Sequence, residues 1–178
     1  MRSAFKVSLG GAAAALGLVL MFMTAIIPFG TYAFPTFAGV LLVAVVIEIG
    51  YSLAIGVYIV TAILSFLLAP DKEAALWYAI FMGYYPVIKS LIERLRSMIA
   101  QYLIKFLIFN ACVIAAFFIA AYLLSIPKES YTIFGVYMPL LFLLLGNIYF
   151  LLYDICITRI VTIYLLKWHN KLNKNTKL

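Results

Sequence analysis

Residues 98–124 read MIAQYLIKFLIFNACVIAAFFIAAYLL. This segment carries one charged side chain, that of Lys105, and is otherwise almost wholly apolar. The hydrocarbon core of a bilayer is about 30 Å thick, and about 20 apolar residues in a helix are enough to cross it. This stretch therefore predicts a membrane-spanning helix.

The whole chain has the same character. It has 178 residues, of which 67% are hydrophobic and 11% are charged. A soluble domain averages about 45–50% apolar and about 25% charged residues. A chain this short must cover its own surface with polar atoms if water surrounds it. The composition therefore predicts that lipid surrounds most of the surface.

Five further apolar segments precede or follow residues 98–124, and short turns separate them. We predict an all-α integral membrane protein, a compact bundle of six transmembrane helices in a single domain over residues 1–178. A loop is expected at 31–35, a proline kink at Pro86, and an interfacial, polar tail at 158–178. The apolar run nearest the N-terminus, residues 7–29, is longer than the about 7–15 residues of a signal-peptide core, so we interpret it as a membrane span. The predicted spans are 7–29, 36–49, 53–68, 74–92, 98–124 and 136–157.

The lysines and arginines predict the orientation, because cytoplasmic loops retain them. An even number of spans places only Lys72 and Lys128 of the 13 on one side. Both termini are therefore expected in the cytoplasm, and the net charge of +7 is expected to face anionic lipid headgroups rather than nucleic acid. The cytoplasmic set is Arg2, Lys6, Lys89, Arg94, Arg96, Lys105, Arg159, Lys167, Lys171, Lys174 and Lys177.

Motifs for catalysis are missing from the sequence. His169 is the only histidine, and no Ser/His/Asp set, phosphate-binding glycine loop or His-Glu metal motif occurs. Cys112 and Cys156 lie in apolar runs with no partner for a metal or redox motif. We expect no enzyme activity, no cofactor and no metal.

Two acidic residues fall inside predicted spans. Glu48 and Asp154 lie near the inner ends of their spans, and a charge at membrane depth is costly unless it is paired. Ion pairs at the cytoplasmic interface with the basic stretch from Lys89 to Arg96, which includes Arg94, and with Arg159 would satisfy them. The alternative is a proton or sodium relay through the two carboxylates.

Polar side chains also fall at one depth in the middle of the bilayer. Asn110, Asn147 and Tyr84 come to similar heights, and an asparagine in hydrocarbon needs a partner. The two asparagines either bond between helices or form the floor of an outward-opening pocket. The walls of such a pocket would be Trp77, Tyr78, Tyr85 and Tyr149.

The first span opens with GGAAAALG at residues 10–17. Gly10, Ala13, Ala14 and Gly17 share one helical face, and small residues let another helix approach closely. The approaching helix belongs either to the same chain or to a separate membrane protein.

Six spans, cytoplasmic termini, this small-residue face and the Tyr-Ala-Phe-Pro sequence at 32–35 together resemble the S components of energy-coupling factor (ECF) transporters. These are substrate-binding membrane subunits. The resemblance implies that the chain captures a vitamin or similar micronutrient from outside, and it adds Tyr32 and Phe34 to the candidate binding residues. It also implies a bacterial cytoplasmic membrane as the location.

The resemblance implies partners as well: a coupling transmembrane protein and two cytoplasmic ATPases. The family docks through an alanine, three residues and an alanine in the first span. The matching pairs here begin with glycine, and they are Gly10 with Ala14 and Gly11 with Ala15. The candidate docking residues are Gly10, Gly11, Ala13, Ala14, Ala15 and Gly17.

The charges expected outside predict the kind of substrate. They lie in loops and include no arginine, so a small neutral or aromatic compound fits better than a strong anion. Two other functions stay open: a scaffold like the rod-shape proteins of the cell-wall machinery, and a stand-alone secondary transporter that uses Glu48 or Asp154. The outer charges are Asp71, Lys72, Glu73, Lys128 and Glu129.

Overall fold

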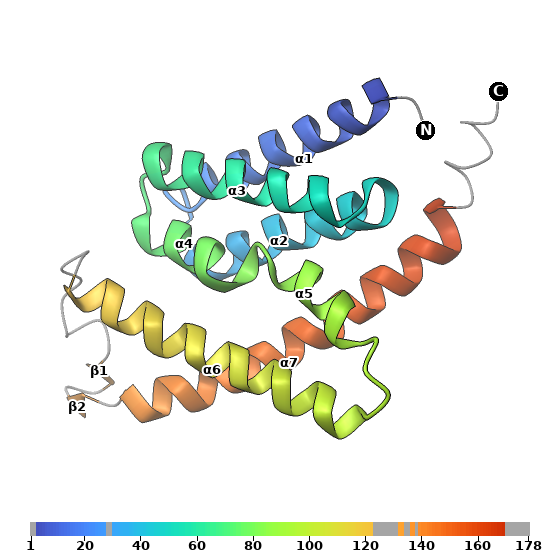
Figure 1. Ribbon diagram of the computed structural model, residues 1–178. Helices are drawn as coiled ribbons and strands as arrows, with labels where there is room; N and C mark the ends of the chain where they lie inside the picture. Colours follow the sequence, from blue (N-terminus) through green and yellow to red (C-terminus); the bar gives the residue numbers. More distant parts are fainter. Residues whose placement is uncertain (1–2, 28–29, 123–131, 134–135, 138, 170–178) are drawn as a thin grey trace.

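A computed structural model of the chain describes residues 3–27, 30–122, 132–133, 136–137 and 139–169 (Figure 1). Over these residues the structure is helical apart from turns and one pair of two-residue strands, and six helical segments are long and apolar enough to cross a membrane. The elements are α1 (Ser3–Met23), α2 (Gly30–Ile49), α3 (Tyr51–Leu68), α4 (Lys72–Trp77), the π-helical turn η1 (Tyr78–Met82), α5 (Tyr85–Ile92), α6 (Met98–Tyr122), β1 (Thr132–Ile133), β2 (Val136–Tyr137), α7 (Pro139–Tyr164) and the π-helical turn η3 (Leu165–His169).

The fourth span, α4 to α5, lies at the centre of the bundle. Of its apolar window 61% is buried, against 33% or less in every other span. On one side it packs with α1, α2 and α3 around Leu42 and Tyr78. On the other side Phe81, Tyr85 and Phe150 join it to α6 and α7, which run together along one flank (Figure 1).

The bundle has two ends, each named here after one residue that lies there. The beginning of α1, the end of α7 and the α5–α6 connection with Arg94 lie at one end (Figure 1), called here the Arg94 end. The α3–α4 connection with Asp71 and the beginning of α7 lie at the other, called the Asp71 end. The first and last spans therefore start and finish at the same end of the bundle.

The boundary between the first two spans differs from the prediction. Helix α1 ends at Met23 rather than at residue 29, which is outside the described residues. The hydroxyl of Thr24 donates to the carbonyl oxygen of Met21 at 2.7 Å, and this local bond competes with the helical pattern. The predicted loop at 31–35 is also wrong, because α2 begins at Gly30 and includes it.

Helix α2 contains Pro35 in its second turn, where the missing N–H leaves the carbonyl group of Thr31 without its helical donor. The next carbonyl along the helix, that of Tyr32, accepts from two side chains. Thr36 Oγ1 donates to it at 2.8 Å, and the hydroxyl of Tyr149 donates to it at 3.2 Å, so α7 is bonded to this turn of α2.

The fourth span contains more than the predicted kink at Pro86. The π-helical turn η1 and the turn at 83–84 separate α4 from α5. Pro86 lies in the first turn of α5, where a missing N–H costs nothing. The hydroxyl of Tyr153, on α7, donates at 3.0 Å to the carbonyl oxygen of Met82. A neighbouring helix therefore stabilises the break.

The remaining boundaries are partly as predicted. Helices α3 and α6 agree with the predicted spans within two residues. The predicted start of the last span at 136 is wrong, because 136–137 form β2 and Pro139 begins α7. The tail predicted from 158 is helical through residue 169. The predicted outer loop with Lys128 and Glu129 and the polar tail at 170–178 lie outside the described residues.

Replacing Gly39 with alanine should disrupt the crossing of α2 and η1. A Cβ atom at this position would lie 2.2 Å from the carbonyl oxygen of Met82 and 2.7 Å from the hydroxyl of Tyr153. A backbone atom cannot move aside cheaply, so we expect a loss at the upper end of the about 1–3 kcal/mol seen for overpacking.

Unfolding of purified protein in mixed detergent would measure this loss. Gly56→Ala is the matched control, because a Cβ there meets nothing within 4 Å. Equal stability of the two variants would contradict the close approach of α2 to η1.

Candidate functional site

A cavity of about 540 Å³ lies at the Asp71 half of the bundle, between α2, the fourth span, α6 and α7. This volume is typical of sites for small molecules, which span about 300–1,000 Å³. The lining residues are Tyr32, Trp77, Met82, Phe109, Val113, Ile114, Phe117, Phe118, Phe142, Leu143, Leu145, Gly146 and Tyr149.

The walls of the cavity are aromatic because of helical spacing. Phe109, Val113 and Phe117 recur every four residues and share one face of α6. Gly146 and Tyr149 follow one another on a face of α7. A Cβ at Gly146 would lie 3.6 Å from the Phe109 ring, so the missing side chain leaves room beside that ring.

The polar atoms of the lining side chains bond to the protein. The hydroxyl of Tyr149 lies 2.6 Å from Thr36 Oγ1. The hydroxyl of Tyr32 and the indole N–H of Trp77 both donate to Glu73 Oε1, at 2.9 Å and 3.4 Å. The walls therefore present ring faces and aliphatic groups to the interior of the cavity.

Glu73 is the charged group nearest to this aromatic pair. Its two neighbours in the sequence have other partners. Asp71 caps α4 at the backbone N–H of Ala74, at 3.0 Å, and Lys72 Nζ donates to the carbonyl oxygen of Phe66 at the end of α3, at 2.7 Å. The rings of Tyr32 and Trp77 meet edge to face, with centroids 5.8 Å apart. The Glu73 carboxylate therefore accepts from two aromatic residues that line the cavity, although Glu73 itself does not line it.

Three of the predicted binding residues, Tyr32, Trp77 and Tyr149, line the cavity. The other six do not. Phe34 lies against Gly30 at the start of α2, and Tyr78 is buried in the core. The hydroxyl of Tyr84 lies 2.9 Å from Cys112 Sγ. The remaining three, Tyr85, Asn110 and Asn147, bond to other side chains as described below.

The two predicted mid-membrane asparagines bond to each other. Each amide nitrogen donates to the other's oxygen at 3.0 Å, and each also donates to a carbonyl of its own helix at 2.8 Å. Asn110 and Asn147 therefore join α6 to α7 and are not the floor of the pocket. Sequence reasoning missed the phenylalanines of α6, although their four-residue spacing was a usable signal.

Replacing one asparagine should cost more than replacing both. Asn110→Leu leaves the Asn147 amide in hydrocarbon without its partner, whereas the double leucine variant removes both amides. Coupling between polar groups on membrane helices averages about 0.6 kcal/mol and reaches about 1.7 kcal/mol. A double-mutant cycle with Asn147→Leu, followed by detergent unfolding, measures it. Strictly additive losses would contradict the paired amides.

An ion cluster joins α5, α6 and α7 in the Arg94 half of the bundle. Lys89, Lys105 and Asp154 are 2%, 3% and 5% exposed. Lys89 Nζ bonds to the Asp154 carboxylate, and Lys105 Nζ lies 3.1 Å and 3.2 Å from its two oxygens. The hydroxyl of Tyr85 donates to the same carboxylate at 2.6 Å. One carboxylate thus connects three helices.

Glu93 closes this cluster toward the Arg94 end. Its side chain is 39% exposed and lies 2.6 Å from Lys89 Nζ and 2.8 Å from Lys105 Nζ. Burial raises the pKa of Glu93, but the hydrogen bonds from the two lysines outweigh it and hold the pKa below its usual value. The two cations and two carboxylates therefore balance.

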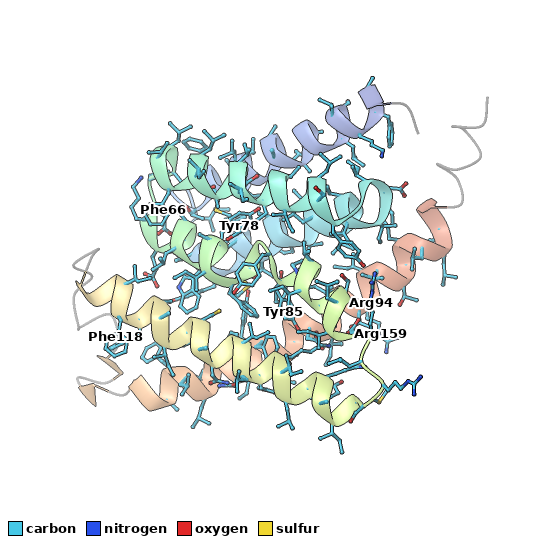
Figure 2. The ribbon with its side chains drawn as sticks, in the orientation of Figure 1. Phe66, Tyr78, Tyr85, Arg94, Phe118 and Arg159 are labelled. Carbon is cyan, nitrogen blue, oxygen red and sulfur yellow. The ribbon has the colours of Figure 1, made fainter. Side chains whose placement is uncertain are left out.

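The predicted inner ion pair of Asp154 is partly confirmed, because Asp154 pairs with Lys89 of the basic stretch, but its second partner is Lys105 and not one of the predicted arginines. Arg94 follows the end of α5 and donates to the hydroxyl of Tyr51 at 2.7 Å. Arg96 and Arg159 are exposed, and Figure 2 places Arg94 and Arg159 at the end opposite to Phe118. Glu48 interacts with Tyr164 of α7. The two buried lysines, Lys89 and Lys105, lie within α5 and α6, and the sequence alone does not tell which residues of a membrane helix face inward.

The small-residue face of α1 divides in two. Cβ atoms at Gly10 and Gly17 would lie 3.1 Å and 3.0 Å from side chains of α3, so these glycines pack within the chain. Ala13 and Ala14 are half-buried beside them. A Cβ at Gly11 meets nothing within 4 Å, and Ala15 is exposed on the same side. Only the second predicted docking pair is open to another protein.

Neither comparison of the sequence nor comparison of the fold identifies a relative: no protein-family model, curated protein or solved structure matches this chain. Its six apolar helices make it a multi-pass membrane protein.

Proposed function

We propose that the protein is the substrate-capture subunit of an importer of the ECF type. It binds a small, flat, mostly apolar micronutrient in the cavity at the Asp71 half of the bundle. The observation that supports this most is the cavity of about 540 Å³ with aromatic walls contributed by four spans. A cavity of this size with mostly apolar walls and a few polar groups is typical of a small-molecule site.

The expected orientation agrees with capture from outside. The sequence predicts eleven of the 13 lysines and arginines on one side of the spans, and of the described ones Arg94 and Arg159 lie at the Arg94 end (Figure 2). By the positive-inside rule we expect this side to be cytoplasmic. The cavity then faces the medium. Its walls offer ring faces rather than free cationic groups, which favours an aromatic compound over a multiply charged anion.

Import requires energy from partners under this proposal. The chain docks on a coupling transmembrane protein, which two cytoplasmic ATPases drive. The exposed pair Gly11 and Ala15 offers a surface that another helix can approach closely.

Identification of a co-purified molecule tests the proposal. The protein is purified in mild detergent, and small molecules released by denaturation are identified by mass spectrometry. We expect one stoichiometric compound with a flat apolar core. Recovery of phospholipid alone, together with no thermal stabilisation by a panel of vitamins, would contradict the proposal.

A non-transporting scaffold is the second candidate. The reciprocal Asn110–Asn147 pair favours it, because these amides bond between helices rather than to a ligand. A scaffold predicts that bulk inside the cavity is harmless and bulk at Gly11 abolishes partner binding. An ion-coupled carrier receives less support, because Asp154 is paired with two lysines.

A further inference from the structure

The positions of the charged side chains relative to the cavity indicate which charge a ligand can carry. Glu73 Oε1 accepts from both Tyr32 and Trp77, which line the cavity. The adjacent cation, Lys72, bonds instead to carbonyl groups at the end of α3. Lys72 is exposed, and the buried lysines of the described residues, Lys89 and Lys105, belong to the ion cluster in the opposite half, where carboxylates balance them.

Both aromatic donors use the same carboxylate oxygen. Glu73 is not itself a lining residue, and its charge lies directly behind the two lining rings that donate to it, within 2.9 Å of the Tyr32 hydroxyl. Aromatic rings attract cations through their faces, and a ring whose N–H or O–H donates to a carboxylate becomes more electron-rich. A carboxylate behind two such rings favours a positive charge in the apolar cavity that they line and disfavours a negative one.

The size and the walls of the cavity define the rest of the ligand. Seven of the 13 lining residues are aromatic, and apart from Tyr32, Trp77 and Tyr149 the lining is phenylalanine, aliphatic side chains, Met82 and Gly146. Such walls suit a flat ring system, which packs against ring faces. A second charge placed deep in the cavity would lose its water without gaining a partner.

The structure assigns to this cavity a flat aromatic ligand with one positive charge, its rings among the phenylalanines of α6 and its charge beside Glu73. This inference rests on the proposed function, because it names the class of substrate for the same cavity. An uncharged aromatic compound is the competing ligand.

Three probes of similar shape test the assignment. N-methylacridinium is a permanent cation, acridine is neutral near neutral pH, and acridine carboxylate is an anion. Binding to the full chain in zwitterionic nanodiscs is measured by probe fluorescence, with empty nanodiscs subtracted. We expect the cation to bind about tenfold or more tightly than acridine, and the anion to bind more weakly than both.

The variant Glu73→Gln keeps the acceptor oxygen and removes the charge. We expect it to lower the affinity for the cation about tenfold and leave acridine binding unchanged, which also demonstrates that the variant is folded. Lys72→Gln is the matched control at the next position. It should change the affinity for the cation less than about twofold, because this lysine bonds away from the cavity.

The outcomes separate the inference from the proposed function. Equal binding of cation and acridine to the wild type, or equal loss of both in Glu73→Gln, overturns the assigned charge while the cavity remains a ligand site. If a bulky side chain at Gly146 leaves all binding intact, or if no probe binds, the cavity holds no such ligand, and both the inference and the proposed function fail.

Discussion

Replacing Asp154 with alanine should destabilise the protein by about 3–5 kcal/mol, the range for removing one partner of a buried ion pair. This carboxylate accepts from Lys89, Lys105 and Tyr85, which come from α5 and α6. Without it, two cations that are 2% and 3% exposed face each other with only Glu93 nearby. Like charges in such surroundings repel strongly because the medium screens them little. Figure 2 places Tyr85 beside this junction, between α5 and the α6–α7 flank.

Denaturation in mixed detergent would measure this loss, and two further variants interpret it. Glu93→Gln should cost much less, since its side chain is 39% exposed and water can replace the lost contacts. The triple variant Lys89→Met, Lys105→Met, Asp154→Leu removes every buried charge and should recover most of the stability. If the triple variant were as unstable as Asp154→Ala, loss of shape rather than unpaired charge would be the cause.

Replacing Gly146 with phenylalanine should weaken ligand binding about a hundredfold or more, which corresponds to about 2.7 kcal/mol. This glycine lines the cavity beside the ring of Phe109, and a side chain built on it extends into the space that a ligand would occupy. The fold should survive, because a Cβ at Gly146 makes an ordinary contact of 3.6 Å with that ring. Binding of the acridinium probe in nanodiscs measures the loss.

Two controls accompany this variant. Gly146→Ala adds only the Cβ atom and should bind within about twofold of the wild type, since the cavity loses little volume. Gly56→Phe places the same side chain on α3, where a Cβ meets nothing within 4 Å, and should bind normally. Normal binding by Gly146→Phe would mean that the probe binds elsewhere.

The candidate site was only partly predictable from the sequence. Trp77 and Tyr149 were expected at a pocket because a tryptophan or tyrosine at membrane depth combines a large ring with a polar group that needs a partner. Asn110 and Asn147 were informative in the same way, yet they satisfy each other rather than a ligand. Gly146 carries no signal in the sequence, because a glycine in a helix lines a cavity only when a neighbouring helix leaves space beside it. The phenylalanines of α6 look alike whether they face lipid or the cavity.

Six apolar helices follow from the sequence alone, because the length and composition of each segment are local properties and lipid requires each segment to satisfy its own backbone hydrogen bonds. The sequence also predicts that the charges gather mostly on one side of the spans. Contacts between the helices establish which polar groups pair, that Asp154 binds Lys105 as well as Lys89, and that a cavity remains between α6, α7 and the fourth span. In a membrane helix both the lipid-facing and the inward-facing sides are apolar, so periodicity does not reveal the buried face, and contacts between helices alone establish it.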